Sequence, residues 1–277
     1  EDPILPFGTR LNDEYKHDTK RVVIWPIGEG GFGRVYLTRH VETGRYEAVK
    51  VVLLEKTQGR GLTIEQSHAL TLKRVEKLRK ALAEAETMVT LREDGIHQNV
   101  VAIREVALLR NVSSTLEEKF KDNLFIFMDF VNGTTLYDFI KRERPLESVA
   151  PIMLDVALGI LRLEEKKITT LDLKPENILV EFDGDHVRGK LADFGAGITR
   201  SYASPEIMLR LEDAEETAHA WLFGTTLLAV LSRGRNWSNY SEADKKLEKM
   251  RQETLHDELH RDLLDLCVRC MHRDPKE

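Results

Sequence analysis

The chain has 277 residues, of which 42% are hydrophobic and 32% are charged, and its formal net charge is −6. This length is sufficient for a large buried core and for more than one lobe. The acidic balance gives no general attraction to nucleic acid, and no apolar run approaches the ~18 residues of a membrane span. We therefore expect neither a nucleic-acid partner nor membrane insertion.

The ends of the chain and its cysteines carry little functional information. No targeting segment is visible, and the chain begins at Glu1 rather than Met, which indicates a trimmed N-terminus and leaves secretion open. The two cysteines, Cys267 and Cys270, lie in an amphipathic stretch and no second pair follows. This pattern predicts buried helical thiols rather than a zinc or redox site, and two cysteines cannot form a disulfide framework.

The first part of the chain is rich in predicted strands. Five segments with many β-branched and aliphatic residues predict strands at 21–26, 34–38, 47–54, 99–106 and 124–130. From Thr63, a suitable N-cap, to about Arg92 the apolar spacing becomes helical, and we expect one break inside this helix. Polar stretches at 56–63 and 110–123 predict loops.

After Asn132-Gly133 the chain becomes mainly helical. Helical spacing predicts helices at 135–142, 147–166, 214–232, 241–256 and 259–271. One hairpin interrupts them, with strands at 178–182 and 187–192. The order of elements predicts an α+β fold of two lobes, residues 1–131 and 132–277, with a hinge near 129–133. The sequence does not indicate an oligomeric state.

A glycine-rich segment lies between the first two predicted strands. Ile27-Gly28-Glu29-Gly30-Gly31-Phe32-Gly33-Arg34-Val35 contains the spacing G-x-G-x-x-G. A dinucleotide-binding turn would lead into a helix, whereas a strand is predicted here, and no Gly-Lys-Ser/Thr follows as in a Walker loop. Glycines in such a hairpin let backbone N–H groups approach phosphates, although an ordinary hairpin would have the same local pattern.

A lysine lies inside an apolar predicted strand, in Ala48-Val49-Lys50. An ammonium group in such a place is costly unless it is paired. We expect it to contact phosphates on one side and a carboxylate of the following helix on the other. Glu84 is favoured as that carboxylate because Met88 and Leu91 then share its packed face, and Glu86 stays open as the alternative.

The strongest chemical signal is Asp172-Leu173-Lys174-Pro175-Glu176-Asn177. Phosphoryl transfer requires a carboxylate that orients a hydroxyl, a cation near the phosphate and oxygen ligands for a metal. This segment supplies all three. Asp193-Phe194-Gly195 follows the predicted hairpin, and its carboxylate could share Mg²⁺ with Asn177, because hard cations prefer oxygen ligands.

These four segments, in this order, resemble the eukaryotic protein kinase family over roughly residues 20–277. Ser204-Pro205-Glu206 stands at the family's Ala-Pro-Glu position, and Trp221-Leu222-Phe223-Gly224 stands at its Asp-x-Trp-x-x-Gly helix. The resemblance implies the bilobal kinase fold, with a small antiparallel β-sheet lobe that carries one helix and a larger, mainly helical lobe. It also implies ATP and Mg²⁺ as cofactors.

The resemblance assigns roles residue by residue. Lys50, paired with Glu84, would hold the α- and β-phosphates, Asp172 would be the catalytic base, and Lys174 would neutralise the γ-phosphate. Asn177 and Asp193 would bind Mg²⁺. Met128 falls at the gatekeeper position, and the backbone of Asp129 and Val131 would read adenine. The nucleotide-binding residues that the resemblance implies are Ile27, Gly28, Glu29, Gly30, Gly31, Phe32, Gly33, Val35, Ala48, Lys50, Met128, Asp129, Val131, Leu136 and Leu179.

Three positions depart from the family pattern. Thr170 replaces the catalytic-loop His, Leu171 replaces the Arg, and His219 replaces the Asp of Asp-x-Trp. We expect His219 to donate to a backbone carbonyl and so rebuild the support of the loop, with loss of support as the opposing interpretation. Because position 171 is Leu and not Arg, a phosphate on the activation segment would lack the cation that usually binds it. That segment is also short, with only residues 196–203 between Gly195 and Ser204.

The sequence therefore predicts a divergent, non-RD serine/threonine protein kinase that uses ATP and Mg²⁺ and acts on a protein substrate. Lys174 and Thr199, at the family's substrate-loop threonine, favour Ser/Thr over Tyr as acceptor. We expect no activation by loop phosphorylation. Expanded segments in the first lobe are similar to those of kinases secreted by apicomplexan parasites. An ATP-binding pseudokinase and a small-molecule kinase are the alternatives.

Overall fold

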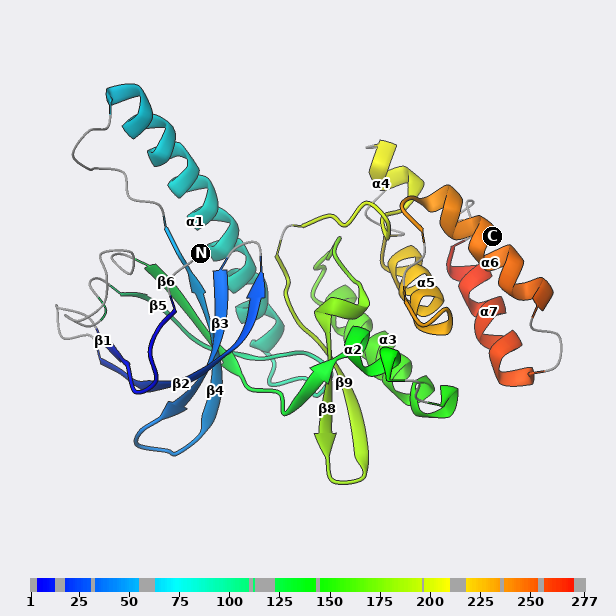
Figure 1. The fold of residues 1–277 in the computed structure, drawn as a ribbon, viewed down its shortest axis with the longest axis horizontal. Coiled ribbons are helices and arrows are strands. Elements are labelled where there is room, and N and C mark those ends of the chain that lie inside the picture. Colours follow the sequence, from blue (N-terminus) through cyan, green and yellow to red (C-terminus); the bar gives the residue numbers. More distant parts are fainter. Residues whose placement is uncertain are drawn as a thin grey trace. The chain divides into compact units, whose positions relative to one another are not determined.

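A computed structural model of the chain shows two compact units. The residues that it describes are 4–12, 18–30, 33–54, 63–109, 112, 123–142, 145–195, 197–209, 218–234, 237–253 and 257–271. Unit 1 comprises Glu1–Arg92 and Ala102–Phe130, and unit 2 comprises Glu93–Val101 and Val131–Glu277. Figure 1 labels the elements of each unit.

Unit 1 is built on one antiparallel sheet with one helix. Its described strands are β1 (Arg10–Asn12), β2 (Asp18–Gly30), β3 (Gly33–His40), β4 (Tyr46–Val52), β5 (Ile103–Leu109) and β6 (Asn123–Asp129). They pair in the order β1-β2-β3-β4-β6-β5. One face of this sheet forms a core, and its largest members are Leu5, Leu11, Tyr36, Leu109, Phe125 and Phe127.

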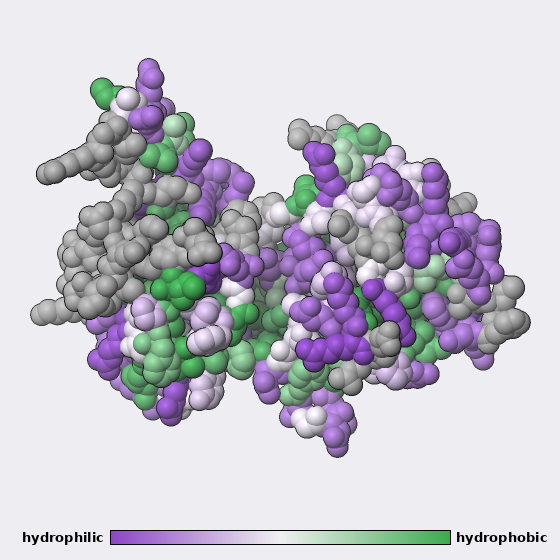
Figure 2. All heavy atoms as spheres, viewed as in Figure 1, coloured by the Kyte–Doolittle hydropathy of each residue, from purple (hydrophilic) through white to green (hydrophobic). Residues whose placement is uncertain are grey.

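Helix α1 (Ile64–Arg92) is continuous over 29 residues, so the predicted break inside it is wrong. Its first turn explains where it begins. The Thr63 hydroxyl accepts from the Gln66 backbone N–H at 3.2 Å, and the Gln66 side chain accepts from the Thr63 N–H at 2.9 Å. This reciprocal pair is a capping box, which satisfies two backbone donors at the exposed end of the helix. In Figure 2 the surface of α1 is mostly hydrophilic, with hydrophobic residues set among the charges.

Strand β5 begins later than its apolar sequence predicts. The prediction placed a strand at 99–106, whereas β5 starts at Ile103. The reason is tertiary pairing. The backbone of Asn99 and Val101 bonds to Leu191 at the end of β9, with the Leu191 N–H donating to Asn99 O at 2.8 Å and the Val101 N–H donating to Leu191 O at 2.9 Å.

Unit 2 is mainly helical. Its described helices are α2 (Leu136–Lys141), α3 (Ala150–Glu165), α4 (Pro205–Leu209), α5 (Ala218–Leu231), α6 (Tyr240–Glu253) and α7 (Glu258–Cys270), with 3₁₀ turns η2 (Leu146–Ser148) and η3 (Pro175–Asn177). A small antiparallel sheet joins β7 (Gly133–Thr135), β8 (Ile178–Asp183) and β9 (His186–Leu191) in that order. A sheet-rich unit and a helix-rich unit confirm the predicted α+β class.

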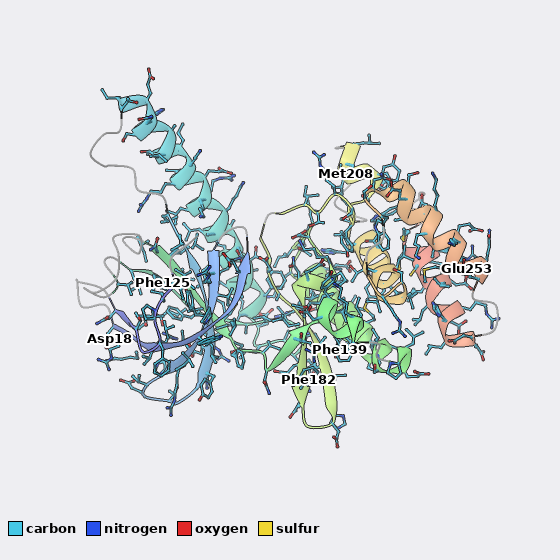
Figure 3. All side chains as sticks on the ribbon, in the orientation of Figure 1. Asp18, Phe125, Phe139, Phe182, Met208 and Glu253 are labelled. Atoms are coloured by element: carbon cyan, nitrogen blue, oxygen red, sulfur yellow. The ribbon has the colours of Figure 1, made fainter. Side chains whose placement is uncertain are left out.

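The core of unit 2 forms around α5, which is buried on nearly all sides. An apolar helix without a wet face belongs in the interior of a domain. Gly224 lets α7 approach closely, because a Cβ at this position would lie 2.8 Å from the Cβ of Cys270. Cys267 is fully buried, and burial raises the pKa of its thiol. Cys267 therefore serves packing, as predicted, whereas Cys270, also predicted to be buried, is only half-buried. At the other side of the unit, Phe139 of α2 packs on Phe182 of β8 with ring centroids 6.3 Å apart (Figure 3).

None of the helices in the described part of the chain combines the length and the apolar character that crossing a bilayer requires.

Candidate functional site

The glycine-rich segment is a hairpin of β2 and β3. Gly28 lies opposite Val35, and Gly30 lies opposite Gly33. The glycine-rich segment is therefore followed by strand β3 and not by a helix. A dinucleotide-binding turn, which would lead into a helix, is thereby excluded. A Cβ at Gly33 would lie 2.0 Å from the carbonyl oxygen of Val51, so only glycine fits this position. Gly31 and Phe32, at the tip, lie outside the described residues.

Lys50 of β4 and Glu84 of α1 form a buried ion pair. The Lys50 Nζ lies 2.7 Å from each Glu84 carboxylate oxygen, and the two side chains are 11% and 4% exposed. Glu86 is exposed, so of the two acidic residues that the sequence offered, Glu84 is the partner. A pair with this little solvent requires close geometry to offset the loss of hydration. α1 supplies it, because Ala81, Ala85 and Met88 pack the same face.

The predicted nucleotide residues of unit 1 share one face of its sheet. Val35 lies opposite Lys50 in the β3–β4 register, and Ala48 lies opposite Met128 in the β4–β6 register. Cross-strand neighbours share a face, and so do residues two apart in a strand. Val35, Ala48, Lys50 and Met128 therefore form a patch on the face opposite the Phe125–Phe127 core. Alternation within single strands produces this arrangement.

The remaining predicted residues of the β2–β3 hairpin lie at its surface. Ile27 is 45% exposed, and Glu29 forms an ion pair with Arg34 at 3.0 Å across the hairpin. This pair links the two strands just before their tip.

The predicted hinge residues are held by specific contacts. The Asp129 N–H donates to the carbonyl of Ala102 at 2.9 Å, and its carboxylate pairs with Arg104 of β5. In unit 2, Val131 is buried and Leu179 is half-buried in β8. Leu136 is 0% exposed at the start of α2. Complete burial favours a core role for Leu136 over a contact with a ligand.

The catalytic-loop residues of unit 2 converge on the Asp172 carboxylate. Its Oδ2 accepts from Lys174 Nζ at 2.7 Å and from Asn177 Nδ2 at 3.1 Å, and its Oδ1 accepts from the Thr199 hydroxyl. Lys174 Nζ also lies 2.8 Å from Thr199 Oγ1. Thr199, 27 residues further along the chain than Asp172, thus reaches the same group. A carboxylate that contacts a cation and a hydroxyl group in this way can act as a general base, which takes a proton from a hydroxyl.

Oxygen ligands for a cation are available from Asn177 and Asp193. The Asn177 amide nitrogen donates to the backbone oxygen and the Oδ2 of Asp172, which assigns its Oδ1 to the other side. The Asn177 carbonyl accepts from the Ala192 N–H at 2.9 Å, so Asp193 follows directly on a residue tied to Asn177. Asp193 is exposed and has φ 56°, in the left-handed region that non-glycine residues rarely adopt. Amide and carboxylate oxygens fit Mg²⁺.

No cluster of three His, Cys, Asp or Glu residues suited to a metal occurs in the part of the chain that the structure describes. A Mg²⁺ ion that is shared with phosphates needs only one or two protein carboxylates, because the phosphates and water fill its other positions. The donor set of Asn177 and Asp193 is therefore compatible with a metal that arrives with a nucleotide.

His219 supports the catalytic loop in a way that differs from the prediction. Its Nε2 accepts from the backbone N–H of Thr170 at 3.1 Å, whereas we expected it to donate to a carbonyl. Its Nδ1 faces Glu164 Oε1 at 3.5 Å, so the proton belongs on Nδ1. Burial lowers the pKa of His219 below its ordinary 6.5, against the opposing effect of the Glu164 carboxylate. A neutral imidazole can accept at Nε2, and a protonated one cannot.

Two hydroxyl groups of α5 contact the catalytic loop and the segment that follows Gly195, and neither contact was predicted. The Thr226 hydroxyl donates to the carbonyl of Leu173 at 3.4 Å, and the Thr225 hydroxyl to that of Tyr202 at 3.2 Å. Glu164, the partner of His219, also went unpredicted. A cluster of hydroxyl residues in an otherwise apolar helix was the only available signal, and it did not specify which carbonyls they would meet.

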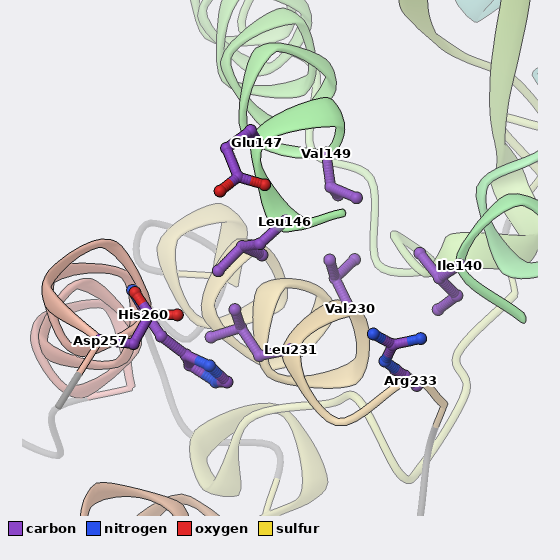
Figure 4. A pocket seen from close by; sticks show the side chains of 9 residues that line it. All are labelled: Ile140, Leu146, Glu147, Val149, Val230, Leu231, Arg233, Asp257 and His260. Atoms are coloured by element: carbon purple, nitrogen blue, oxygen red, sulfur yellow. The ribbon is translucent and has the colours of Figure 1, made fainter. Parts of the chain in front are cut away.

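A pocket of about 250 Å³ lies elsewhere in unit 2, with walls from η2, the end of α5 and the start of α7 (Figure 4). Apolar side chains, among them Leu146 and Leu231, form much of its lining, and His260 contributes a polar group. None of the predicted site residues lines it, so this pocket is separate from the Asp172 cluster and from the Lys50–Glu84 pair.

Comparison with known proteins agrees with this geometry. The protein kinase domain model matches residues 22–277. The probable serine/threonine protein kinase IRE4 of Arabidopsis thaliana is 31% identical over 62% of this chain and 14% of its own length. Mitogen-activated protein kinase 7 of the same plant is 28% identical over 79% of this chain and 56% of its own length. CBL-interacting protein kinase 21 of Oryza sativa subsp. japonica is 26% identical over 74% of this chain and 36% of its own length. The chain thus spans from about a seventh to about half of the length of these relatives.

The family model covers nearly the whole chain, and the Gly-rich hairpin, the Lys50–Glu84 pair and the Asp172 cluster occupy the parts of the fold where the resemblance placed them. The chain therefore belongs to the protein kinase domain family.

Proposed function

We propose that this protein transfers the γ-phosphate of Mg-ATP to serine or threonine side chains of protein substrates. The observation that carries the proposal is the Asp172 cluster, in which one carboxylate is in hydrogen-bond contact with Lys174, Asn177 and Thr199. Phosphoryl transfer depends on positioning and on charge stabilisation rather than on covalent help from the protein. The residues that touch phosphate or metal in this family are all retained, and names of relatives as serine/threonine kinases support the choice of acceptor.

Each residue has a distinct part in the proposed reaction. Asp172 orients the acceptor hydroxyl and takes its proton. Lys174 neutralises charge on the transferred phosphate, and its contact with Thr199 keeps it beside Asp172. Bound Mg²⁺, held by Asn177 and Asp193, would neutralise the phosphate oxygens.

The contacts with the nucleotide complete the proposal. Lys50, fixed by Glu84, contacts the α- and β-phosphates beneath the glycine-rich hairpin. For the adenine ring we propose contacts from Val35, Ala48, Met128, Asp129, Val131 and Leu179. Leu136 is left out of this set because it is completely buried. We keep the two lobes at 1–131 and 132–277 as the proposed functional division.

A transfer assay with radiolabelled ATP, Mg²⁺ and myelin basic protein tests the proposal. We expect transfer by the wild type, and a loss of roughly 10²–10⁴-fold in Asp172→Ala, the range of general-base catalysis. Asp193→Ala should require much higher Mg²⁺. Asp183→Ala removes an exposed carboxylate of β8 and should leave transfer unchanged. Equal transfer by wild type and Asp172→Ala would refute the assignment.

The same preparation distinguishes a pseudokinase. A rise in melting temperature with Mg-ATP, combined with no transfer by the wild type under any metal, would show nucleotide binding without turnover. The contact between His219 and Thr170 weighs against that outcome, because the loop keeps a support where the family's usual pair is missing.

A further inference from the structure

Arg104 lies at an irregularity of β5. Ile103 pairs with Met128 of β6, and Glu105 pairs with Phe127, the next residue back along β6. Arg104 is therefore an extra residue in the register between the two strands, which is the definition of a β-bulge. A bulge turns a side chain out of the normal alternation of a strand, and bulges are frequent beside functional sites.

The side chain of Arg104 contacts the carboxylate of Asp129, the last residue of β6. Its Nε and Nη2 both contact Asp129 Oδ1, and the two side chains are 20% and 22% exposed. The Asp129 N–H donates to the carbonyl of Ala102 at 2.9 Å. Asp129, a predicted hinge residue, is therefore held at its backbone and at its side chain by the short segment 102–104.

A second carboxylate lies directly across the sheet from Asp129. Glu47 of β4 is the cross-strand partner of Asp129, and cross-strand partners share one face of a sheet. Like charges in such positions repel each other. Each carboxylate has its own cation here, because Arg21 contacts Glu47 at 2.6 Å and Arg104 contacts Asp129.

Arg21 is already committed to other groups. It also contacts Glu105, and its guanidinium lies 4.2 Å from the centre of the Phe127 ring. Its side chain is only 7% exposed. Among the described residues, Asp129 forms an ion pair with Arg104 alone. Removal of Arg104 would therefore leave the Asp129 carboxylate without a cation and opposite another carboxylate.

We propose that Arg104 is a positioning residue for adenine recognition. It holds Asp129 against the repulsion of Glu47, so that the backbone at Asp129 keeps the place from which it contacts the base. The role is indirect, because Asp129 shares the sheet face of Glu47, whereas the nucleotide patch with Met128 lies on the other face. This inference rests on the proposed function, in which Asp129 and Val131 contact adenine.

Competition of ATP and GTP against ATP labelled on its ribose with N-methylanthraniloyl tests the proposal, with Mg²⁺ present and fluorescence anisotropy as the readout. The two nucleotides share their phosphates and differ in the donors and acceptors of the base, so the ratio of their affinities reports on recognition of the base. We expect the wild type to prefer ATP. Arg104→Met keeps the apolar stem and should weaken ATP binding about tenfold and GTP binding much less, because the contact with the base is no longer preorganised.

Two further variants separate charge repulsion from general damage to unit 1. Arg104→Met combined with Asp129→Asn should regain most of the preference for ATP, since position 129 then carries no charge that Glu47 repels. Asp129→Asn alone should keep the preference, because Arg104 can donate to an amide oxygen. As a control, Arg79→Met removes an exposed ion pair between Arg79 and Glu76 of α1 and should leave both affinities unchanged.

In the transfer assay, Arg104→Met should raise the KM for ATP about tenfold and leave kcat unchanged, which is the pattern of lost ground-state binding. Equal weakening of ATP and GTP would indicate a merely structural role and would refute the proposal, as would a double variant no better than Arg104→Met. An unchanged preference for ATP in Arg104→Met would refute this inference and leave the proposed function intact. A wild type that binds neither nucleotide would refute both.

Discussion

At the residue scale, the burial of Lys50 and Glu84 separates their contribution to stability from their contribution to function. Removing one member leaves the other charge buried without its partner, whereas replacing both with apolar groups of similar size removes the cost of burying charge. We predict that Glu84→Leu lowers the free energy of unfolding by about 3–5 kcal/mol. The double variant Lys50→Met with Glu84→Leu should regain most of that stability.

Urea unfolding and the transfer assay together check this prediction. The double variant should be stable and inactive, because the phosphate-contacting ammonium is gone. A double variant that is as unstable as Glu84→Leu would contradict the argument, since it would show that the pair stabilises the unit beyond its own desolvation cost.

His219 gives the stability of unit 2 a dependence on pH. Its pKa in the folded state is lowered by burial, with the Glu164 carboxylate opposing, so the unfolded chain takes up a proton at higher pH than the folded chain. The stability from neutral His219 is therefore fully present above pH 6.5 and is lost as pH falls through the lower folded value, with a slope of at most about 1.4 kcal/mol per pH unit. Protonation also replaces the Nε2 acceptor of the Thr170 N–H with a donor.

His219→Gln is the variant that tests this dependence, because a glutamine oxygen can accept from the Thr170 N–H at any pH. We predict that urea unfolding between pH 7.5 and 5 shows a smaller loss of stability for His219→Gln than for the wild type. Parallel curves for the two proteins would show that His219 does not titrate in this range.

Residue types at the site were predictable, and the way they are held was not. Lys50, Asp172 and Asn177 are recognisable because phosphoryl transfer restricts which side chains can serve and at what spacing. The contact between Thr170 and His219 joins positions 49 residues apart, and its direction depends on which nitrogen Glu164 faces. The contact with Glu164 fixes that tautomer and burial favours the neutral imidazole, and both are properties of the folded chain.

At the element scale, small residues control how closely α3 and β9 pack. A Cβ at Gly189 of β9 would lie 2.8 Å from the carbonyl oxygen of Ile152 in α3, a backbone atom that cannot turn aside. The Gly189 N–H also donates to Asp155 Oδ2 at 2.8 Å, and its carbonyl accepts from Asn99 at 3.1 Å. Moving the strand away would break both bonds.

We predict that Gly189→Ala destabilises unit 2 by about 1–3 kcal/mol, as overpacking commonly does. Gly28→Ala is the matched control, since a Cβ at that strand glycine would meet only the Val35 side chain at 3.7 Å. Chemical denaturation should show a clear shift of the midpoint for Gly189→Ala and little for Gly28→Ala. Equal shifts would mean that loss of glycine in a strand, and not the contact with Ile152, sets the effect.

Long elements with strong local signals were predictable, and short ones were not. Thr63 is the N-cap of α1, as predicted, and it was recognisable because the capping box joins residues that are only three apart in the sequence. β1 and β7 have three residues each, too few to show an apolar period. The break predicted inside α1 does not occur, and the helix runs without interruption from Ile64 to Arg92.

At the scale of the whole molecule, strands and helices occupy separate stretches of sequence, which made the α+β class predictable. The grouping of residues 93–101 with unit 2 was not predictable, because it rests on backbone bonds between Asn99, Val101 and Leu191. Hydrogen bonds between distant backbone groups leave no mark on side-chain composition. Sequence patterns therefore identify the elements and most of the chemistry, and tertiary pairing decides the borders.

Regulation is the last property that belongs to the whole molecule. Phosphate on an activation segment acts by pairing with a cation of the catalytic loop, and here Leu171 offers none. The Thr199 hydroxyl already contacts Asp172 and Lys174. We predict that complete dephosphorylation changes the transfer rate by less than about twofold, because position 171 offers no cation with which a phosphate on the segment could pair. Phosphatase treatment, verified by mass spectrometry, followed by the transfer assay measures this change.

Phosphate on Thr199 should inhibit transfer and not activate it. The modification would place about two negative charges beside the Asp172 carboxylate. Thr199→Glu, which places a carboxylate at that point, should therefore lower transfer strongly, while Thr199→Ser should retain it because the hydroxyl that bonds Asp172 remains. If dephosphorylation abolished transfer and Thr199→Glu restored it, the protein would be switched on by loop phosphorylation, and the segment would need a cationic clamp from a source other than position 171.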